Sequence, residues 1–237
     1  MSSDPFTFFA DNLSLFGSKT TEHLELTFAA VGVAIAIAIP LGIWLGHIHR
    51  GSFLAISVSN IGRALPSLAV ISIGIGILGI GFLNTLVALV ILAGPVILTN
   101  AFVAVDGIDP DVVQAARAMG MTPRQVLWRV ELPLALPLIF AGLRTATVYV
   151  VATATLATFA GGGGLGDIIV NEPTYGTAGV IAASLAIAVL AFAIDGLLAL
   201  VQRGVTPSPL RRQGRKPRTA AVVTDAAWET GGSSQPT

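Results

Sequence analysis

Cysteine is absent from this sequence of 237 residues, which excludes disulfides and metal sites built on thiolates. Charged residues are also scarce at 11%, whereas a soluble domain normally carries about 25%. This number of charges is too small to cover a water-facing surface, and lipid must therefore contact most of the chain. Hydrophobic residues make up 54% of the sequence, and its mean hydropathy is +0.82. The composition therefore predicts an integral membrane protein.

The sequence also lacks the pattern G-x-x-x-x-G-K-[ST], so the chain does not bind ATP through a phosphate-binding loop of that kind. The looser pattern G-x-G-x-x-G occurs twice, at Gly74, Gly76 and Gly79 and at Gly161, Gly163 and Gly166. A dinucleotide site needs this pattern between a strand and a helix, whereas both copies lie in or at the end of apolar stretches. We interpret such glycines as packing positions, and Gly42 with Gly46 as a pair that lets two helices approach closely.

Five stretches are long and apolar enough to be membrane-spanning helices, which need about 20 residues each. They cover approximately residues 24–47, 54–80, 82–105, 132–159 and 177–201. The tetrapeptide GIGF joins the second stretch to the third as a tight hairpin. Basic residues, which favour the cytoplasmic side, follow the first, third and fifth stretches. The sequence predicts an all-α polytopic membrane protein with five transmembrane helices, its N-terminus outside and its C-terminus in the cytoplasm.

The two ends of the chain differ from the apolar body, residues 22–203, which we predict to be the transmembrane domain. Residues 1–21 form an external leader, in which apolar residues recur at helical spacing: Phe6, Phe9, Leu13 and Phe16. This spacing predicts a short interfacial helix on the outer surface, and a partly ordered leader is the alternative. Residues 204–237 are rich in basic residues, Pro, Gly, Ser and Thr, which predicts a disordered basic cytoplasmic tail.

A polar and basic connection over residues 109–129 separates the third span from the fourth. Asp109 followed by Pro110 is typical of a helix start, and Gly120 is typical of the position just after a helix end. Thr122, which also precedes a proline, predicts a second short helix. The first helix carries small residues, so the groove of a partner protein can close onto its backbone. The alternative is a surface connector held against the bilayer by its apolar residues.

Arg144 and Asp195 are the clearest ionisable residues well inside the predicted spans. Charges in a membrane are costly unless they are partnered. At a rise of 1.5 Å per residue, each lies roughly 10 Å from the cytoplasmic end of its span. The two spans are consecutive and antiparallel, so we predict an ion pair. The alternative is separate solvation, with Arg144 snorkelling and Asp195 facing a water-filled path.

Residues 114–137, QAARAMGMTPRQVLWRVELPLALP, resemble the EAA loop of binding-protein-dependent ABC importer permeases. That motif reads roughly E-A-A, three residues, G, about nine residues, then I-x-L-P. This chain has Gln114 where the family usually has Glu, which removes one charge from a polar contact. It keeps the two alanines, the glycine at Gly120 and the sequence V-E-L-P at residues 130–133. Five spans with an external N-terminus are also similar to the methionine-importer permeases.

Four further segments are similar to the osmoprotectant branch of that family, which imports glycine betaine, choline, carnitine or proline. They are RALPSLAV (63–70), VALVILAGPVILTNAF (87–102), VELPLALPLIFAGLRTATV (130–148) and ATLATFAGGGGLGDIIV (154–170). The resemblance covers roughly residues 22–202 and implies a non-enzymatic permease of an ATP-driven importer in the bacterial cell membrane. Alternatives are an importer of another small solute such as an amino acid, a stand-alone secondary transporter, or a membrane scaffold. The lack of a repeat and the few buried acids disfavour a secondary transporter.

The resemblance also implies the partners of the chain. They are an ABC ATPase with two copies per transporter, a second permease that is identical or homologous, an external substrate-binding protein and membrane lipid, but no nucleic acid. ATP and Mg²⁺ belong to the ATPase, and this chain has no cofactor, metal or catalytic residue. The resemblance places the docking of the ATPase on Gln114, Ala115, Ala116, Met119, Gly120 and Met121.

Aromatic residues are scarce, at 7% of the sequence. A cationic cargo such as betaine would suit an aromatic cage, because the face of an aromatic ring attracts cations. The predicted spans offer few candidates beyond Trp44, Tyr149 and Phe159.

Overall fold

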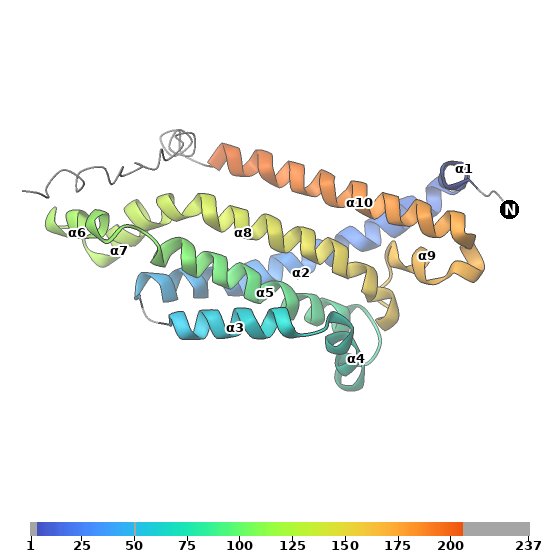
Figure 1. The fold of residues 1–237 in the computed structure, drawn as a ribbon, viewed down its shortest axis with the longest axis horizontal. Helices are drawn as coiled ribbons and strands as arrows, with labels where there is room; N and C mark the ends of the chain where they lie inside the picture. Colours follow the sequence, from blue (N-terminus) through green and yellow to red (C-terminus); the bar gives the residue numbers. More distant parts are fainter. Residues whose placement is uncertain (1–3, 50, 206–237) are drawn as a thin grey trace, which may run out of the picture. The chain divides into compact units, whose positions relative to one another are not determined.

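The computed structural model describes residues 4–49 and 51–205, and each regular element in these residues is helical (Figure 1). In chain order the elements are α1 (Pro5–Asp11), α2 (Leu13–His47), α3 (Ser52–Ala64), α4 (Ser67–Leu78), α5 (Phe82–Asp106), α6 (Pro110–Ala118), α7 (Pro123–Val126), η1 (Leu127–Glu131), α8 (Leu132–Thr153), η2 (Ala154–Ala160), α9 (Gly166–Val170) and α10 (Glu172–Val205). The segment η1 is π-helical and η2 is a 3₁₀ helix. The predicted tail lies outside the described residues from position 206 onward.

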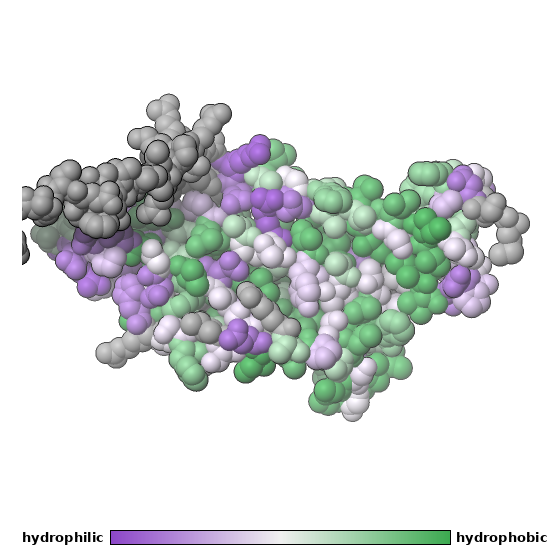
Figure 2. Space-filling view, in the orientation of Figure 1, coloured by the Kyte–Doolittle hydropathy of each residue, from purple (hydrophilic) through white to green (hydrophobic). Residues whose placement is uncertain are grey.

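Four helical stretches among the described residues are long and apolar enough to cross a membrane. They are Leu13–His47, Phe82–Asp106, Pro123–Ala160 and Glu172–Gly204. The helices predicted over 24–47, 82–105, 132–159 and 177–201 lie inside these stretches. Figure 2 shows hydrophobic residues along much of the helical body and hydrophilic residues gathered near α6. The predicted all-helical membrane architecture is therefore confirmed.

The single helix predicted over residues 54–80 is wrong, because α3 ends at Ala64 and α4 begins at Ser67. Between them Leu65 is extended, with φ −71° and ψ 120°, and Pro66 follows. A proline lacks the N–H group of the helix ladder and pushes the preceding residue out of the helical region. Both halves pack against α5, so the chain continues along the same neighbour after the break.

Glycines with positive φ lie at the turn between α4 and α5 and at the start of the last apolar stretch. Gly79 and Gly81 have φ of 78° and 140°, and the N–H of Gly81 donates to Ala160 O at 2.6 Å. This turn confirms the predicted hairpin between the second and third apolar stretches. In α10 the helix is interrupted at Gly176, with φ 66° and ψ 171°, so its regular part begins where the fifth span was predicted.

The helix α5 lies at the centre of the fold and contacts α2, α3, α4 and α8. A Cβ atom built on Gly42 of α2 would lie 2.7 Å from the carbonyl oxygen of Leu98, and one on Gly46 would lie 2.8 Å from Val105 Cβ. This confirms that the two glycines let helices approach closely. On the other side of α5, a Cβ on Gly142 of α8 would lie 2.2 Å from Asn100 Cβ.

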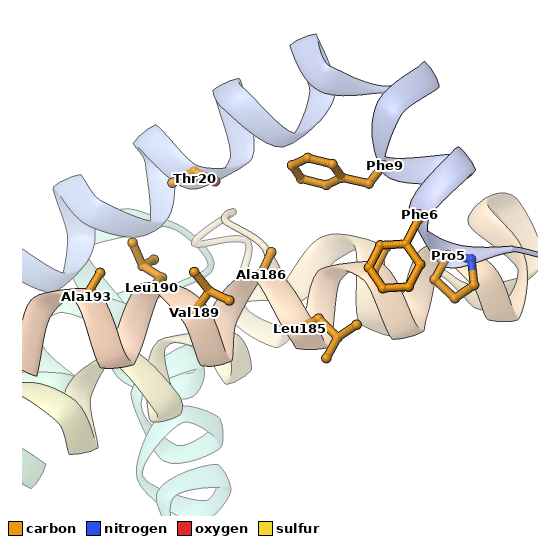
Figure 3. Close-up of a pocket in the computed structure, with 10 residues that line it drawn as sticks. Pro5, Phe6, Phe9, Thr20, Leu185, Ala186, Val189, Leu190 and Ala193 are labelled. Carbon is orange, nitrogen blue, oxygen red and sulfur yellow. The ribbon is translucent and has the colours of Figure 1, made fainter.

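The described part of the predicted leader, residues 4–21, is helical but is divided between two helices. Asp4 caps α1, whose last residue is Asp11, and the remainder of the predicted leader belongs to α2. Figure 3 shows Phe6 and Phe9 of α1 directed into the space between α2 and α10. An apolar pocket of about 430 Å³ lies there, and its lining is hydrocarbon except for Thr20. This lining does not suit a charged solute.

We predict that Gly42→Val destabilises the protein because the added carbons collide with the backbone of α5. Overpacking of this kind costs about 1–3 kcal/mol, so the melting temperature and the yield of folded protein in detergent should both fall. The control is Gly32→Val in the same helix, where a Cβ meets nothing within 4 Å. Equal melting temperatures for the two variants would show that close packing at Gly42 is unimportant.

Candidate functional site

The helix α6 begins and ends at the predicted residues. Asp109 caps its start by accepting the N–H of Asp111 at 2.9 Å, and a proline occupies the first turn. At the other end Gly120 has φ of 84°. Its N–H donates to the carbonyl of Arg117 at 2.9 Å, and the N–H of Met121 donates to the carbonyl of Ala116 at 3.3 Å. These two bonds form a Schellman motif, which satisfies carbonyls that the helix end would leave unpaired.

The second predicted helix starts as expected but is not a separate short helix. Thr122 and Gln125 form a capping box, with Thr122 Oγ1 accepting the N–H of Gln125 at 3.4 Å. From there the helix continues through η1 into α8, as one stretch over Pro123–Ala160. In η1 the N–H of Leu132 bonds to Leu127 O, one residue further back than in an α-helix. The wider turn accommodates Pro133, which has no N–H to donate.

The six residues predicted to dock the ATPase fall into two groups. Gln114, Ala115, Met119 and Gly120 are exposed, and the side chain of Met119 is 76% exposed. Met121 is half-buried, whereas Ala116 is only 2% exposed and packs in a cluster with Val113 and Val126. The surface that α6 offers to a partner is therefore made by the exposed group, and Ala116 holds α6 onto the membrane body.

A buried polar contact that we did not predict lies next to this loop. His47 Nδ1, at the end of α2, lies 2.6 Å from Glu131 Oε2 in η1, and the side chain of Glu131 is 1% exposed. The contact joins the end of α2 to the junction between α7 and α8. Glu131 belongs to the V-E-L-P sequence, but nothing in the spacing along the chain identifies His47 as its partner.

Arg144 and Asp195 lie together between α8 and α10. Arg144 Nε donates to Asp195 Oδ1 at 3.0 Å, and Nη2 donates to Oδ2 at 2.7 Å. Gln202 extends the network, because its Oε1 accepts from Arg144 Nη1 at 3.2 Å and its Nε2 donates to Pro137 O at 2.8 Å. On each helix the two residues are seven positions apart, or two turns, so the contacts follow one face of each helix.

The Arg144–Asp195 pair borders a cavity of about 580 Å³ between α8 and α10. The two side chains are 30% and 36% exposed, so the pair is not enclosed by the helices of this chain. The cavity is otherwise lined mainly by small or apolar side chains: Ala141, Val148, Ala188, Ala191 and Phe192, together with Thr145. The guanidinium and carboxylate neutralise each other, and in a membrane-spanning helix an isolated charge would be costly.

A second unpredicted network fixes the glycine-rich loop at the α9 end of α2. Lys19 Nζ lies 2.8 Å from both Glu22 Oε2 and Asp167 Oδ2. Glu22 also accepts the N–H of Gly164 at 2.9 Å, and the Thr158 hydroxyl donates to Asp167. Gly163 and Gly164 have φ of 73° and 92°, a conformation that favours glycine. The second G-x-G-x-x-G segment therefore forms a loop held by side chains, not a dinucleotide site.

This arrangement combines apolar helices that can span a membrane, a capped and exposed helix between two of them, and a neutralised ion pair within them. It defines a polytopic transport permease. Residues 38–207 match the family described as "Binding-protein-dependent transport system inner membrane component". The chain belongs to this family. It is thus a membrane subunit of an ABC importer and not an enzyme, and its partners include an ATPase and a substrate-binding protein.

Two relatives from Bacillus subtilis (strain 168) are similar over most of their length. The choline transport system permease protein OpuBB is 38% identical over 199 residues, which cover 82% of this chain and 90% of that protein. The glycine betaine/carnitine/choline transport system permease protein OpuCB is 39% identical over 203 residues, covering 84% and 91%. Among solved structures, an inward-facing MetNI methionine ABC transporter matches with a TM-score of 0.71 and 25% identity, over 87% of this chain and 100% of that chain.

We predict that Arg144→Asp and Asp195→Arg each reduce the amount of folded protein, because each leaves two like charges facing each other in the membrane. The double variant restores an ion pair, so it should recover part of the loss in both folded yield and uptake. Arg203→Asp, a charge reversal at an exposed position of α10, is the control. A double variant no better than the worse single variant would contradict the structural importance of the pair.

Proposed function

We propose that the chain is the transmembrane permease of an ATP-driven importer for quaternary-amine osmoprotectants, namely glycine betaine, choline and carnitine, and for proline. The observation that supports this most is the 38–39% identity to OpuBB and OpuCB across the membrane body. Those proteins are named for choline and for glycine betaine, carnitine and choline transport. The methionine transporter shares the fold at lower identity, so an amino-acid cargo is the second candidate.

In the proposed orientation, α6 faces the cytoplasm and the N-terminus lies outside. The positive-inside rule supports this orientation, because basic residues gather at the α6 end. They include Arg117, Arg124, Arg129 and Arg203. The opposite end carries acidic residues, among them Asp11, Asp167 and Glu172. The sequence beyond α10 also contains basic residues, which the same rule assigns to the cytoplasmic side.

The proposed transporter contains two permeases, identical or homologous, and two ATPase subunits that bind ATP and Mg²⁺. Each α6 docks on an ATPase through its exposed residues, and an external binding protein delivers solute to the opposite face. When the ATPase pair closes, it displaces α6. Because α6 packs on Val126 and the helix continues from α7 into α8, the displacement reaches α8 directly. The His47–Glu131 contact carries it to α2 as well.

We expect Met119→Glu and Ala115→Glu to weaken ATPase binding, because each places a charged side chain on the exposed face of α6. Less ATPase should copurify with the tagged permease, and uptake should fall by at least about tenfold while membrane insertion is unchanged. The matched control is Gly204→Glu, which adds the same charge at an exposed position on α10 where a Cβ meets nothing within 4 Å. If both α6 variants copurify with as much ATPase as the wild type, α6 is not the docking helix.

The cargo is tested by uptake of labelled glycine betaine and choline in a strain without other carriers. This chain, with its ATPase and binding protein, should confer uptake that disappears when the ATPase carries an inactivating substitution. Labelled methionine serves as the competing cargo. Uptake of methionine alone would reject the osmoprotectant assignment and favour the amino-acid importer.

A further inference from the structure

A small cavity lies between α3, α5 and α8, next to the cavity that the ion pair borders, and Thr145 lines both. Its volume is about 280 Å³, close to the lower end of the range for small-ligand sites, about 300 Å³. It is open on one side, and its lining consists of Gly62, Leu92, Val96, Thr145 and Tyr149. None of these five side chains carries a charge. The only aromatic ring among them belongs to Tyr149, which is 41% exposed.

Tyr149 lies deeper than tyrosines normally lie in membrane proteins. It is 11 positions before Ala160, or roughly 15–20 Å along the helix, whereas tyrosines gather at the two membrane interfaces. Its hydroxyl makes no hydrogen bond to another of the described residues. A hydroxyl without a partner is costly in hydrocarbon. The ring is therefore better explained by a water-filled or ligand-filled space than by contact with lipid.

The side chains exposed near α8 also differ in polarity between its α10 side and its α3 side. On one side α10 exposes hydrocarbon side chains along its length, including Leu185, Val189 and Phe192, as expected of a helix in lipid. Toward α3, α8 exposes Tyr149, and Thr145 borders both this cavity and the one beside α10. The facing helix α3 carries serines and an exposed asparagine, Asn60. Polar groups on this face are expected of a helix that borders a water-filled path, not of one that contacts lipid.

The ion pair also affects what this cavity can hold. Arg144 directly precedes Thr145, and a free guanidinium so close to the cavity would repel a cationic solute. Its Nε and Nη2 atoms instead donate to Asp195 on α10, and Nη1 donates to Gln202. The guanidinium is thus held on the α10 side and neutralised, and the polar features of the cavity among the described side chains are an aromatic face and hydroxyl groups.

We infer that Tyr149 contacts the quaternary ammonium group of the solute during its passage, an inference that rests on the proposed function. Trimethylammonium groups offer no N–H donors, so they are recognised by aromatic faces through cation–π attraction. One ring without a carboxylate gives a weak contact, which suits a transit site because the solute must also leave it. The other candidates, Trp44 and Phe159, are exposed near the ends of their helices, whereas Tyr149 lines a cavity between the ends.

The test uses the complete transporter in proteoliposomes, with saturating binding protein and with labelled choline and glycine betaine as probes. Tyr149→Phe keeps the ring and should retain uptake within about twofold. Tyr149→Leu removes the ring and should lower solute moved per ATP hydrolysed by about 3- to 30-fold. Phe28→Leu, at an exposed aromatic position on α2, is the control and should not change this ratio.

Fluorinated phenylalanines at position 149 separate cation–π attraction from shape, because fluorine weakens the ring face while the size changes little. Uptake should fall stepwise as fluorines are added, and this series decides the outcome if Tyr149→Leu does not assemble. Uptake unaffected by both leucine and fluorination would overturn the inference while leaving the proposed function intact. If the wild-type transporter carries neither probe, the proposed function and the inference both fail.

Discussion

Close contact at glycine positions around α5 is the constraint on which the other features of the fold depend. In a membrane the lipid tails are as apolar as the side chains, so helices associate through tight packing and not through exclusion of water. Gly42 and Gly46 bring α2 against α5, and Gly142 brings α8 against its opposite side. Because α6 follows directly after α5, this packing also sets where the exposed helix α6 emerges.

Polar contacts then hold the helices that pack less tightly. The long helix α10 contacts α8, α9 and α1, and only 6% of its apolar, membrane-length segment is buried within this chain. The Arg144–Asp195 pair and Gln202 give it a defined register on α8. At the two ends of α2, His47 contacts Glu131 and Lys19 contacts Asp167. A displacement of α6 therefore acts on helices already fixed to one another near both ends.

Features that depend on neighbouring residues could be predicted from the sequence, whereas most long-range contacts could not. The caps at Asp109 and Gly120 follow from local backbone rules, and the apolar stretches follow from length and composition. The break at Pro66 was not predicted, because whether a proline bends or breaks a helix depends on the packing of both halves. His47 lies 84 residues from Glu131, and Asp167 lies 148 residues from Lys19, so no spacing rule predicts these contacts. Arg144 and Asp195 were an exception, because a membrane leaves an intramembrane charge few partners.

We propose that α6 is the cytoplasmic surface that receives the ATPase. This role is tested most directly with the Met119→Cys variant. Its new cysteine is the only thiol in the chain, because the sequence has no other cysteine. A membrane-impermeant maleimide should label this thiol in inside-out vesicles but not in right-side-out vesicles, and addition of the ATPase should block the labelling. Labelling from the outside, or labelling that the assembled ATPase leaves unchanged, would contradict the account.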